Sequence, residues 1–243
     1  MRIKIIILGL LLAQVVAGQV INMGAGVSDV RNTYVYPDTI NFDSIRIGNA
    51  TDYTVIDDKG IRMYGGATQW DDLTISALSL AGGVQAPSLR AIIGGIASQA
   101  FNFQTANDIV YGVAQLSHSW VYADSIEVHF HCMIEASPSA GDTVVVDFEY
   151  TWADINETVT GSDTIQVKIP VAGWTAKQHK LVEVGWLNGA DKTLSSNIAF
   201  RIERRRDLAS DTYDSANNWW HLWDIDFHYK KNKLGSNDEA SDP

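Results

Sequence analysis

Apolar and polar residues alternate with a period of two along most of this chain, and the three-to-four-residue spacing of helices is almost absent. This alternation predicts strands over residues 127–134, 144–152, 165–169, 182–186, 198–202 and 219–229, with weaker signals at 54–56, 61–64, 73–80 and 109–116. Gly- and Asn-rich turns separate the runs. Many short strands at such spacing predict an all-β fold: an antiparallel β-sandwich or jelly-roll-like single domain.

A turn-forming segment, residues 136–142, separates two of the clearest strands and predicts that they pair as a hairpin. In that register His131 would face Asp147, and His129 would face Glu149. Two imidazoles beside two carboxylates would suit a metal ion or a proton transfer. The alternative is a ladder of complementary charges facing solvent or a partner. We predict no cofactor and no metal, with these four residues as the only metal candidates.

The N-terminus has the parts of a secretory signal. Arg2 and Lys4 precede an apolar run over residues 5–17, which ends in small residues before Gln19. The run is shorter than the roughly 20 residues that span a bilayer. A buried strand or an uncleaved anchor is the alternative. We therefore predict a signal peptide over residues 1–18, a β-sandwich domain over 19–234 and a disordered acidic tail over 235–243. The predicted location is secreted, extracellular or virion, with no membrane span in the mature chain.

Charge and composition narrow the possible functions. The 243 residues carry 18 Lys and Arg against 29 Asp and Glu, a net charge of −11, which argues against a nucleic-acid partner. The single cysteine, Cys132, excludes an internal disulfide framework and a cysteine-based zinc site. No nucleophile elbow, zinc-protease motif or phosphate-binding loop occurs, so we predict no enzymatic activity. The basic run 201–206 predicts ion pairs within the chain or between subunits.

The eight tryptophans admit two interpretations. Trp152, Trp186 and Trp223 fall on apolar strand faces, which predicts that they belong to the core. Others lie near strand ends or in loops, where an indole can stack on a sugar ring or anchor a protein interface. The interface or ligand candidates are Trp70, Trp174, Trp219 and Trp220. By contrast, His221 is predicted to be buried and hydrogen-bonded.

Asp followed by Ser or Thr and then a small or apolar residue recurs along the chain. It resembles the O-glycosylation acceptor of exported Bacteroidetes proteins, whose signal peptides also often end just before Gln. The candidate acceptors are Thr39, Ser44, Ser125, Thr143, Thr164 and Ser215. Alternatively, Asp-Thr and Asp-Ser simply mark the entries of strands.

Several segments together resemble a family of predicted phage virion structural proteins of the head or tail appendage type. The matching segments, in order, are 66–73, 129–131, 147–153, 225–229 and 234–236. The resemblance implies a β-rich, non-enzymatic, self-associating protein without catalytic residues. We therefore expect a homo-oligomeric subunit of a virion appendage or of an extracellular array or filament. Its further partners would be other structural proteins or surface glycans. The alternative is a secreted carbohydrate-binding β-sandwich that uses loop tryptophans.

Overall fold

The computed structural model describes residues 29–31, 34–36, 39–41, 44–57, 59–101, 108–214 and 218–235, with side chains from residue 44 onward. These residues group into two compact units, divided after Gln69 and again after Lys230. The predicted signal peptide (1–18) and nearly all of the predicted tail (235–243) lie outside the described residues. Their assignment, and the 19–234 boundary of the sandwich domain, therefore stay predictions. Among the described residues, no helix is long and apolar enough to cross a membrane.

The first unit is built from short antiparallel strands. A four-stranded sheet has the order β1 (Asp29–Arg31), β4 (Ser44–Gly48), β5 (Tyr53–Asp57) and β6 (Gly60–Tyr64), and β2 (Tyr34–Tyr36) pairs with β3 (Thr39–Asn41). The Tyr53 and Tyr64 rings stack with centroids 4.7 Å apart, and the Arg46 guanidinium lies 3.5 Å from the Tyr53 centroid. A short 3-10 turn, η1 (Gly65–Ala67), follows β6.

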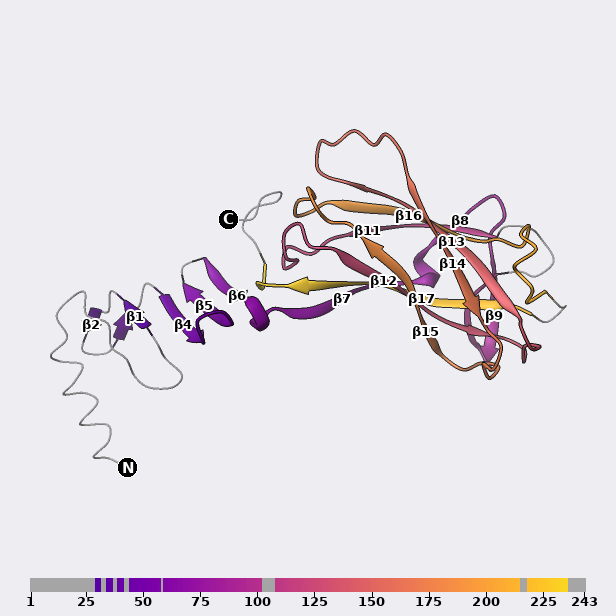
Figure 1. Cartoon of the computed structure of the whole chain (residues 1–243), viewed down its shortest axis with the longest axis horizontal. Coiled ribbons are helices and arrows are strands. Elements are labelled where there is room, and N and C mark those ends of the chain that lie inside the picture. Colours follow the sequence, from indigo (N-terminus) through magenta and orange to yellow (C-terminus); the bar gives the residue numbers. More distant parts are fainter. Residues whose placement is uncertain are drawn as a thin grey trace, which may run out of the picture. The chain divides into compact units, whose positions relative to one another are not determined.

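The second unit contains two larger sheets (Figure 1). The six-stranded sheet has the order β15 (Lys180–Leu187), β12 (Ile126–Ile134), β17 (Trp220–Lys231), β10 (Ile96–Phe101) and β9 (Ser88–Ile93), with β7 (Gln69–Ser76) also paired to β17. The five-stranded sheet has the order β14 (Asp163–Pro170), β13 (Thr143–Ala153), β16 (Asn197–Arg204), β11 (Ile109–Gln115) and β8 (Ala81–Gly82). A 3-10 turn, η2 (Ala77–Ser79), ends the apolar run that was predicted as one strand over 73–80.

The strand order is that of a jelly roll. Reading β10 to β17 as eight consecutive strands, one sheet runs β10-β17-β12-β15 and the other runs β11-β16-β13-β14. This interleaving is characteristic of the eight-stranded jelly roll, in which the chain repeatedly crosses from one sheet to the other. The predicted all-β, jelly-roll-like sandwich is therefore confirmed.

The predicted hairpin between β12 and β13 is wrong. Strand β12 pairs with β15 and β17, whereas β13 pairs with β14 and β16 in the other sheet. Residues 135–142 therefore form a corner between sheets, and the same turn residues serve a corner as well as a hairpin. Local sequence does not separate the two cases. Whether such a segment forms a hairpin or a corner depends on which strands pair with β12 and β13 on their two sides.

The core lies between the two sheets and is rich in aromatic rings. Phe130 and Phe227 from one sheet pack with Phe148 and Phe200 from the other. Trp220 is also fully buried there and contacts Phe130 at a centroid distance of 5.8 Å. The inward positions are those that the period-two pattern predicted for β12, β13 and β16.

Two tryptophans predicted to be core are not. Trp186 is 51% exposed and Trp223 is only partly buried. In both cases a β-bulge shifts the alternation. The pairing of β15 with β12 skips Val184, and the pairing of β17 with β12 skips Trp223 itself. A bulge turns the following side chain to the opposite face. The inward positions have opposite parity on the two sides of each bulge, so an unbroken alternation misplaces an indole; in β17 the core residues are Trp220 and Leu222 before the bulge and Ile225 and Phe227 after it.

The basic run near the end of β16 forms ion pairs within the chain, as predicted. Arg204 and Asp211 are both fully buried and lie 2.9 Å apart. The other arginines pair as follows: Arg201 with Glu149 and Glu203, Arg205 with Asp147 and Asp207, and Arg206 with Asp211. These pairs neutralise the arginines inside the second unit.

Candidate functional site

The most distinctive surface of the second unit is the outward face of the six-stranded sheet, here called the histidine–tryptophan face. The sheet alternation turns hydrophobic residues inward and leaves polar and aromatic side chains outward on adjacent strands. The members are Trp70 and Asp72 on β7, Glu127, His129 and His131 on β12, His179 before β15, Trp186 on β15, and Trp223, Asp226 and His228 on β17.

One end of this face is an aromatic cluster around Trp70. The His228 ring stacks on the Trp70 indole with centroids 4.6 Å apart and planes 6° from parallel. Trp186 meets the same indole at 6.1 Å and 65°. His228 Nδ1 lies 2.5 Å from an Asp72 carboxylate oxygen, and the Lys230 ammonium lies 5.1 Å from the Trp70 centroid. The indole positions are thus fixed by several neighbours.

The other end is a hydrogen-bonded chain of two imidazoles and a carboxylate. His131 Nε2 lies 2.7 Å from Asp226 Oδ2, and His131 Nδ1 lies 2.8 Å from His179 Nε2. The bond to the carboxylate holds His131 as a donor at Nε2, so Nδ1 is the acceptor when the ring is neutral. The Trp223 ring stacks on His179 at 5.4 Å. The sequence reasoning missed His179, because only the fold brings that loop beside β12.

The four metal candidates do not come together. Asp147 bonds Gln166 and Arg205, and Glu149 bonds Ser162 and Arg201, all on the opposite sheet from His129 and His131. His129 instead lies 3.2 Å from Glu127. Within the described ranges, no group of three or more His, Cys, Asp or Glu side chains is placed to hold a metal ion. The histidines do not face these carboxylates because β12 and β13 do not pair as a hairpin.

The remaining tryptophan candidates divide between interior and surface. Trp220 is fully buried in the core, and Trp219 is buried beneath the Arg90 guanidinium, 4.3 Å from its ring centroid. Trp174 is partly buried against the core, with the Lys180 ammonium 5.7 Å away. Of these candidates only Trp70 is exposed, at 44%, with the His228 ring stacked on it. The interface role expected of Trp219 and Trp220 therefore has no exposed indole to support it.

A buried polar network surrounds His221, as predicted. Its Nδ1 lies 2.7 Å from Ser98 Oγ and its Nε2 lies 3.3 Å from Glu135 Oε2. Arg90 donates two hydrogen bonds to Glu135. The residue types are those of a serine–histidine–carboxylate triad. However, Ser98 and His221 are each only 1% exposed, so the serine oxygen is closed to a substrate in this structure.

Burial dominates the electrostatics of this network. It lowers the pKa of His221, and the bond to Glu135 only partly opposes that effect. Burial alone would raise the pKa of Glu135, but the bonds from Arg90 and His221 outweigh it and the net pKa is lowered. A neutral imidazole between a hydroxyl and a carboxylate serves to satisfy buried polar groups.

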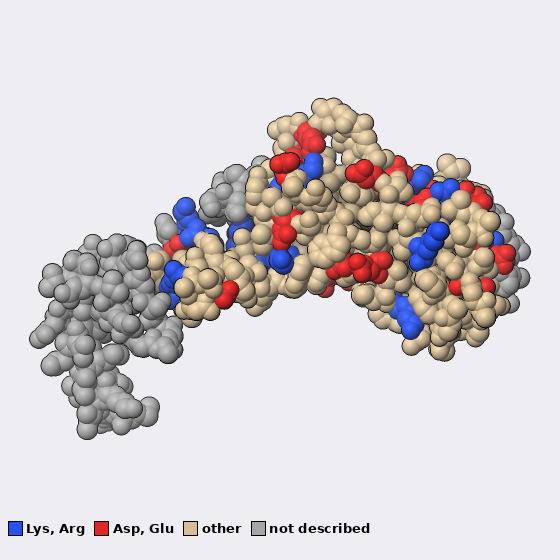
Figure 2. All heavy atoms as spheres, viewed as in Figure 1, with Lys and Arg blue, Asp and Glu red and all other residues tan. Residues whose placement is uncertain are grey.

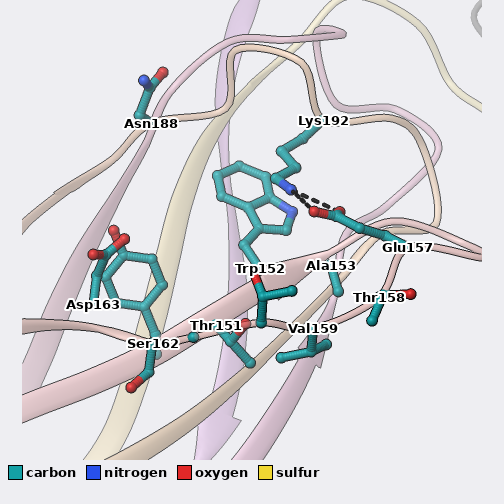
Figure 3. Close-up of a pocket in the computed structure, with 13 residues that line it drawn as sticks. Thr151, Trp152, Ala153, Glu157, Thr158, Val159, Ser162, Asp163, Asn188 and Lys192 are labelled. Atoms are coloured by element: carbon teal, nitrogen blue, oxygen red, sulfur yellow. Dashed lines mark hydrogen bonds and ion pairs between the residues drawn. The ribbon is translucent and has the colours of Figure 1, made fainter.

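A pocket of about 420 Å³ lies beneath the loop that joins β13 to β14 (Figure 3). Lys192 Nζ lies 2.8 Å from Glu157 Oε2 beside the Trp152 indole, whose N–H donates to Ser196. This ion pair is the first cause of a lowered pKa at Glu157. Of the three charged side chains that line the pocket, Lys192 and Glu157 pair with each other and Asp163 is the third.

The edge of the six-stranded sheet is apolar. Strand β9 pairs with β10 and has no other partner strand among the residues that the structure describes. Leu89 and Ile93 on β9 are 65% and 68% exposed, and Ile96 on β10 is 65% exposed. The one charged residue of β9, Arg90, is occupied by Glu135. Unpaired backbone groups flanked by exposed apolar side chains form a template for strand pairing.

The candidate O-glycosylation residues occupy varied positions. Thr164 is exposed, whereas Ser44, Ser125 and Thr143 are partly buried. Thr39 lies in β3, where only the backbone is described, and Ser215 lies outside the described residues. Glycosylation therefore stays a prediction for all six.

Acidic and basic side chains are interspersed over the visible face of the sandwich (Figure 2). The basic side chains are scattered there among acidic ones. The prediction that nucleic acid is not a partner fits this distribution and otherwise stays a prediction.

Comparisons with known proteins add little to this picture. No protein-family model matches the chain, and no curated protein matches it. The resemblance to phage virion structural proteins therefore stays a prediction. Among solved structures, that of the infectious bursal disease virus Gt strain has a TM-score of 0.34 at 12% identity, over 86% of this chain and 42% of that one. The VP2 subviral particle of the same virus has a TM-score of 0.32 at 8% identity, over 79% and 47%. The chain thus spans less than half the length of these structures.

Proposed function

We propose that the protein is a non-enzymatic structural subunit that self-assembles into a virion appendage or an extracellular array or filament. The observation that carries the proposal is the apolar edge strand β9, where Leu89 and Ile93 are exposed and the outer side has no partner strand in the described part of the chain. Soluble β proteins normally blunt such edges with lysine, proline or bulges. Here Pro87 stands just before the strand and Ile92, which the pairing with β10 skips, forms a bulge within it, but β9 carries no lysine or proline and Leu89 and Ile93 remain exposed.

A second copy of this chain is the partner that best fits the edge. Two β9 strands related by a twofold axis would pair antiparallel, which places the same apolar residues of both copies in one contact. The chain carries a net charge of −11, so most surfaces of two copies repel. The β9 edge escapes this repulsion because its only charge, Arg90, is paired within the chain. A contact between two β9 strands is therefore favoured over a contact between more acidic surfaces of the two copies.

Light scattering coupled to size exclusion tests the proposal on the mature chain. We expect a homo-oligomer for the wild type and a monomer for the double variant Leu89→Lys/Ile93→Lys, because charges on an edge oppose strand pairing. Val113→Lys is the matched control, since Val113 is similarly exposed at 61% but lies on β11, which is paired on both sides. A wild type that stays monomeric at high concentration would refute self-assembly, and so would a double variant that still assembles.

A further inference from the structure

Trp70 and Trp186 meet although their strands are not neighbours. The order β7-β17-β12-β15 places their backbones three strand spacings apart, about 14 Å at about 4.8 Å per spacing. Their ring centroids are nevertheless only 6.1 Å apart. The two indoles therefore lean toward each other above β17 and β12. They form an angled aromatic surface over His228 and Glu127.

Both rings remain open to solvent. Trp70 is 44% exposed and Trp186 is 51% exposed, although each indole could contribute greatly to stability if buried. Trp186 is turned outward by the bulge at Val184, which the pairing with β12 skips, and the next residue, Gly185, has a φ of 149° that favours glycine. Bulges that re-aim a side chain are frequent beside functional sites. The exposure of Trp186 thus depends on a specific backbone device rather than on a loose chain end.

The rings are also held in place before any ligand arrives. His228 stacks on one side of Trp70, and Asp72 fixes His228 through a 2.5 Å contact to Nδ1. A surface that is already ordered loses less conformational entropy on binding, and two rigid rings give a large contact area at low cost. The arrangement is that of a prepared binding surface.

The charged groups around the rings already have polar partners, which narrows the chemistry of the ligand. Asp72 lies within hydrogen-bond distance of His228 Nδ1, Glu127 lies 3.2 Å from His129, and Lys230 lies 3.7 Å from Asp124 and also over the Trp70 ring. A cationic ligand would have to displace Lys230 from the indole. A polyanion would meet the carboxylates of an acidic chain. An apolar peptide would cover Asp72 and Glu127 without compensating their desolvation.

A neutral sugar meets all of these conditions. One face of a pyranose ring presents C–H groups that pack against an indole, while its edge presents hydroxyls that hydrogen-bond to carboxylate and ammonium groups. We infer that the Trp70–Trp186 surface binds a neutral saccharide, with the two indoles as stacking platforms. The hydroxyl partners are Asp72 and Lys230, which border the rings. This role is independent of the β9 edge and needs no change in the assembly.

The test uses affinity electrophoresis through gels that contain laminarin, xylan, galactomannan or dextran, followed by a glycan array for microbial and animal glycans. We expect the wild type to be retarded by, or to bind, at least one of these probes. Trp70→Ala and Trp186→Ala should each weaken binding at least tenfold while the thermal midpoint stays near that of the wild type. Tyr111→Ala is the matched control, because Tyr111 is a similarly exposed aromatic residue on the opposite sheet.

Three outcomes would overturn the inference: no binding to any probe, unchanged binding by both tryptophan variants, or equal loss in the Tyr111 variant. The double variant Leu89→Lys/Ile93→Lys separates this inference from the assembly proposal. If it binds the same probe as a monomer, with a single-site affinity, the sugar site stands whatever happens to assembly. Measurement on that variant also removes the gain in apparent affinity that multivalent binding brings.

Discussion

Phe130 and Phe148 meet edge to face at the centre of the sandwich, with ring centroids 6.3 Å apart, although β12 and β13 belong to different sheets. Both side chains are fully buried. Their contact joins the two layers. The rings of Phe200 and Phe227 extend the same cluster, so one aromatic group from each central strand contributes to it.

Phe130→Ala and Phe148→Ala should therefore each lower the free energy of unfolding by about 3–5 kcal/mol, the range for large-to-small changes in a closed core. Chemical denaturation measures this directly. The loss in the double variant should differ from the sum of the two single losses, because the effects of residues in contact are not additive. A loss below about 1 kcal/mol for either variant would show that its side chain does not lie in the core.

The sequence predicted which residues of these strands face inward, but it did not predict which strands pair. Alternation over residues 127–134 and 144–152 depends only on one buried face, and it places Phe130 and Phe148 correctly. Pairing depends on contacts between residues far apart in the chain, such as Ile225 beside Phe130 and Ile202 beside Phe148. For the same reason the sequence did not predict that His179 lies in the candidate site. The bulge that exposes Trp186 likewise depends on the register between β15 and β12, which the local sequence does not specify.

The buried pair Arg204–Asp211 should be essential to the fold. Arg204 also donates to the carbonyl oxygens of Phe101 and Asn218, so the guanidinium links segments distant in sequence. Asp211→Asn keeps the size of the side chain but leaves the arginine charge buried without its carboxylate. We expect it to lower the free energy of unfolding by about 3–5 kcal/mol. Asp207→Asn, which alters an ion pair at the surface, should cost no more than about 1 kcal/mol in the same denaturation series. Equal losses would show that burial does not govern the effect.

Gly189 should tolerate no side chain. A Cβ at this position would lie 1.9 Å from the Asp124 carbonyl oxygen and 2.9 Å from the Trp120 ring, so the backbone would have to move. We expect Gly189→Ala to lower the free energy of unfolding by about 1–3 kcal/mol, as overpacking does in dense interiors. Gly161→Ala is the control, because nothing lies within 4 Å of its Cβ position. If thermal unfolding of the two variants coincides, the loop at Gly189 must yield more easily than its packing indicates.

The free energy of unfolding should decrease as the pH is lowered below the ordinary pKa of His221. Burial lowers the pKa of this imidazole from its ordinary 6.5, so the unfolded chain takes up a proton at a higher pH than the folded protein does. Its contribution to stability is therefore complete above about pH 6.5 and declines as the pH falls below that value. His221→Gln should unfold more easily at pH 8, by about 1–3 kcal/mol for the lost buried hydrogen bonds, but should show a shallower decline between pH 6.5 and 5. Urea denaturation across pH 5 to 8 gives both quantities, and His179→Gln, at an exposed position, should keep the wild-type slope. A slope for His221→Gln as steep as that of the wild type would assign the acid sensitivity to another group.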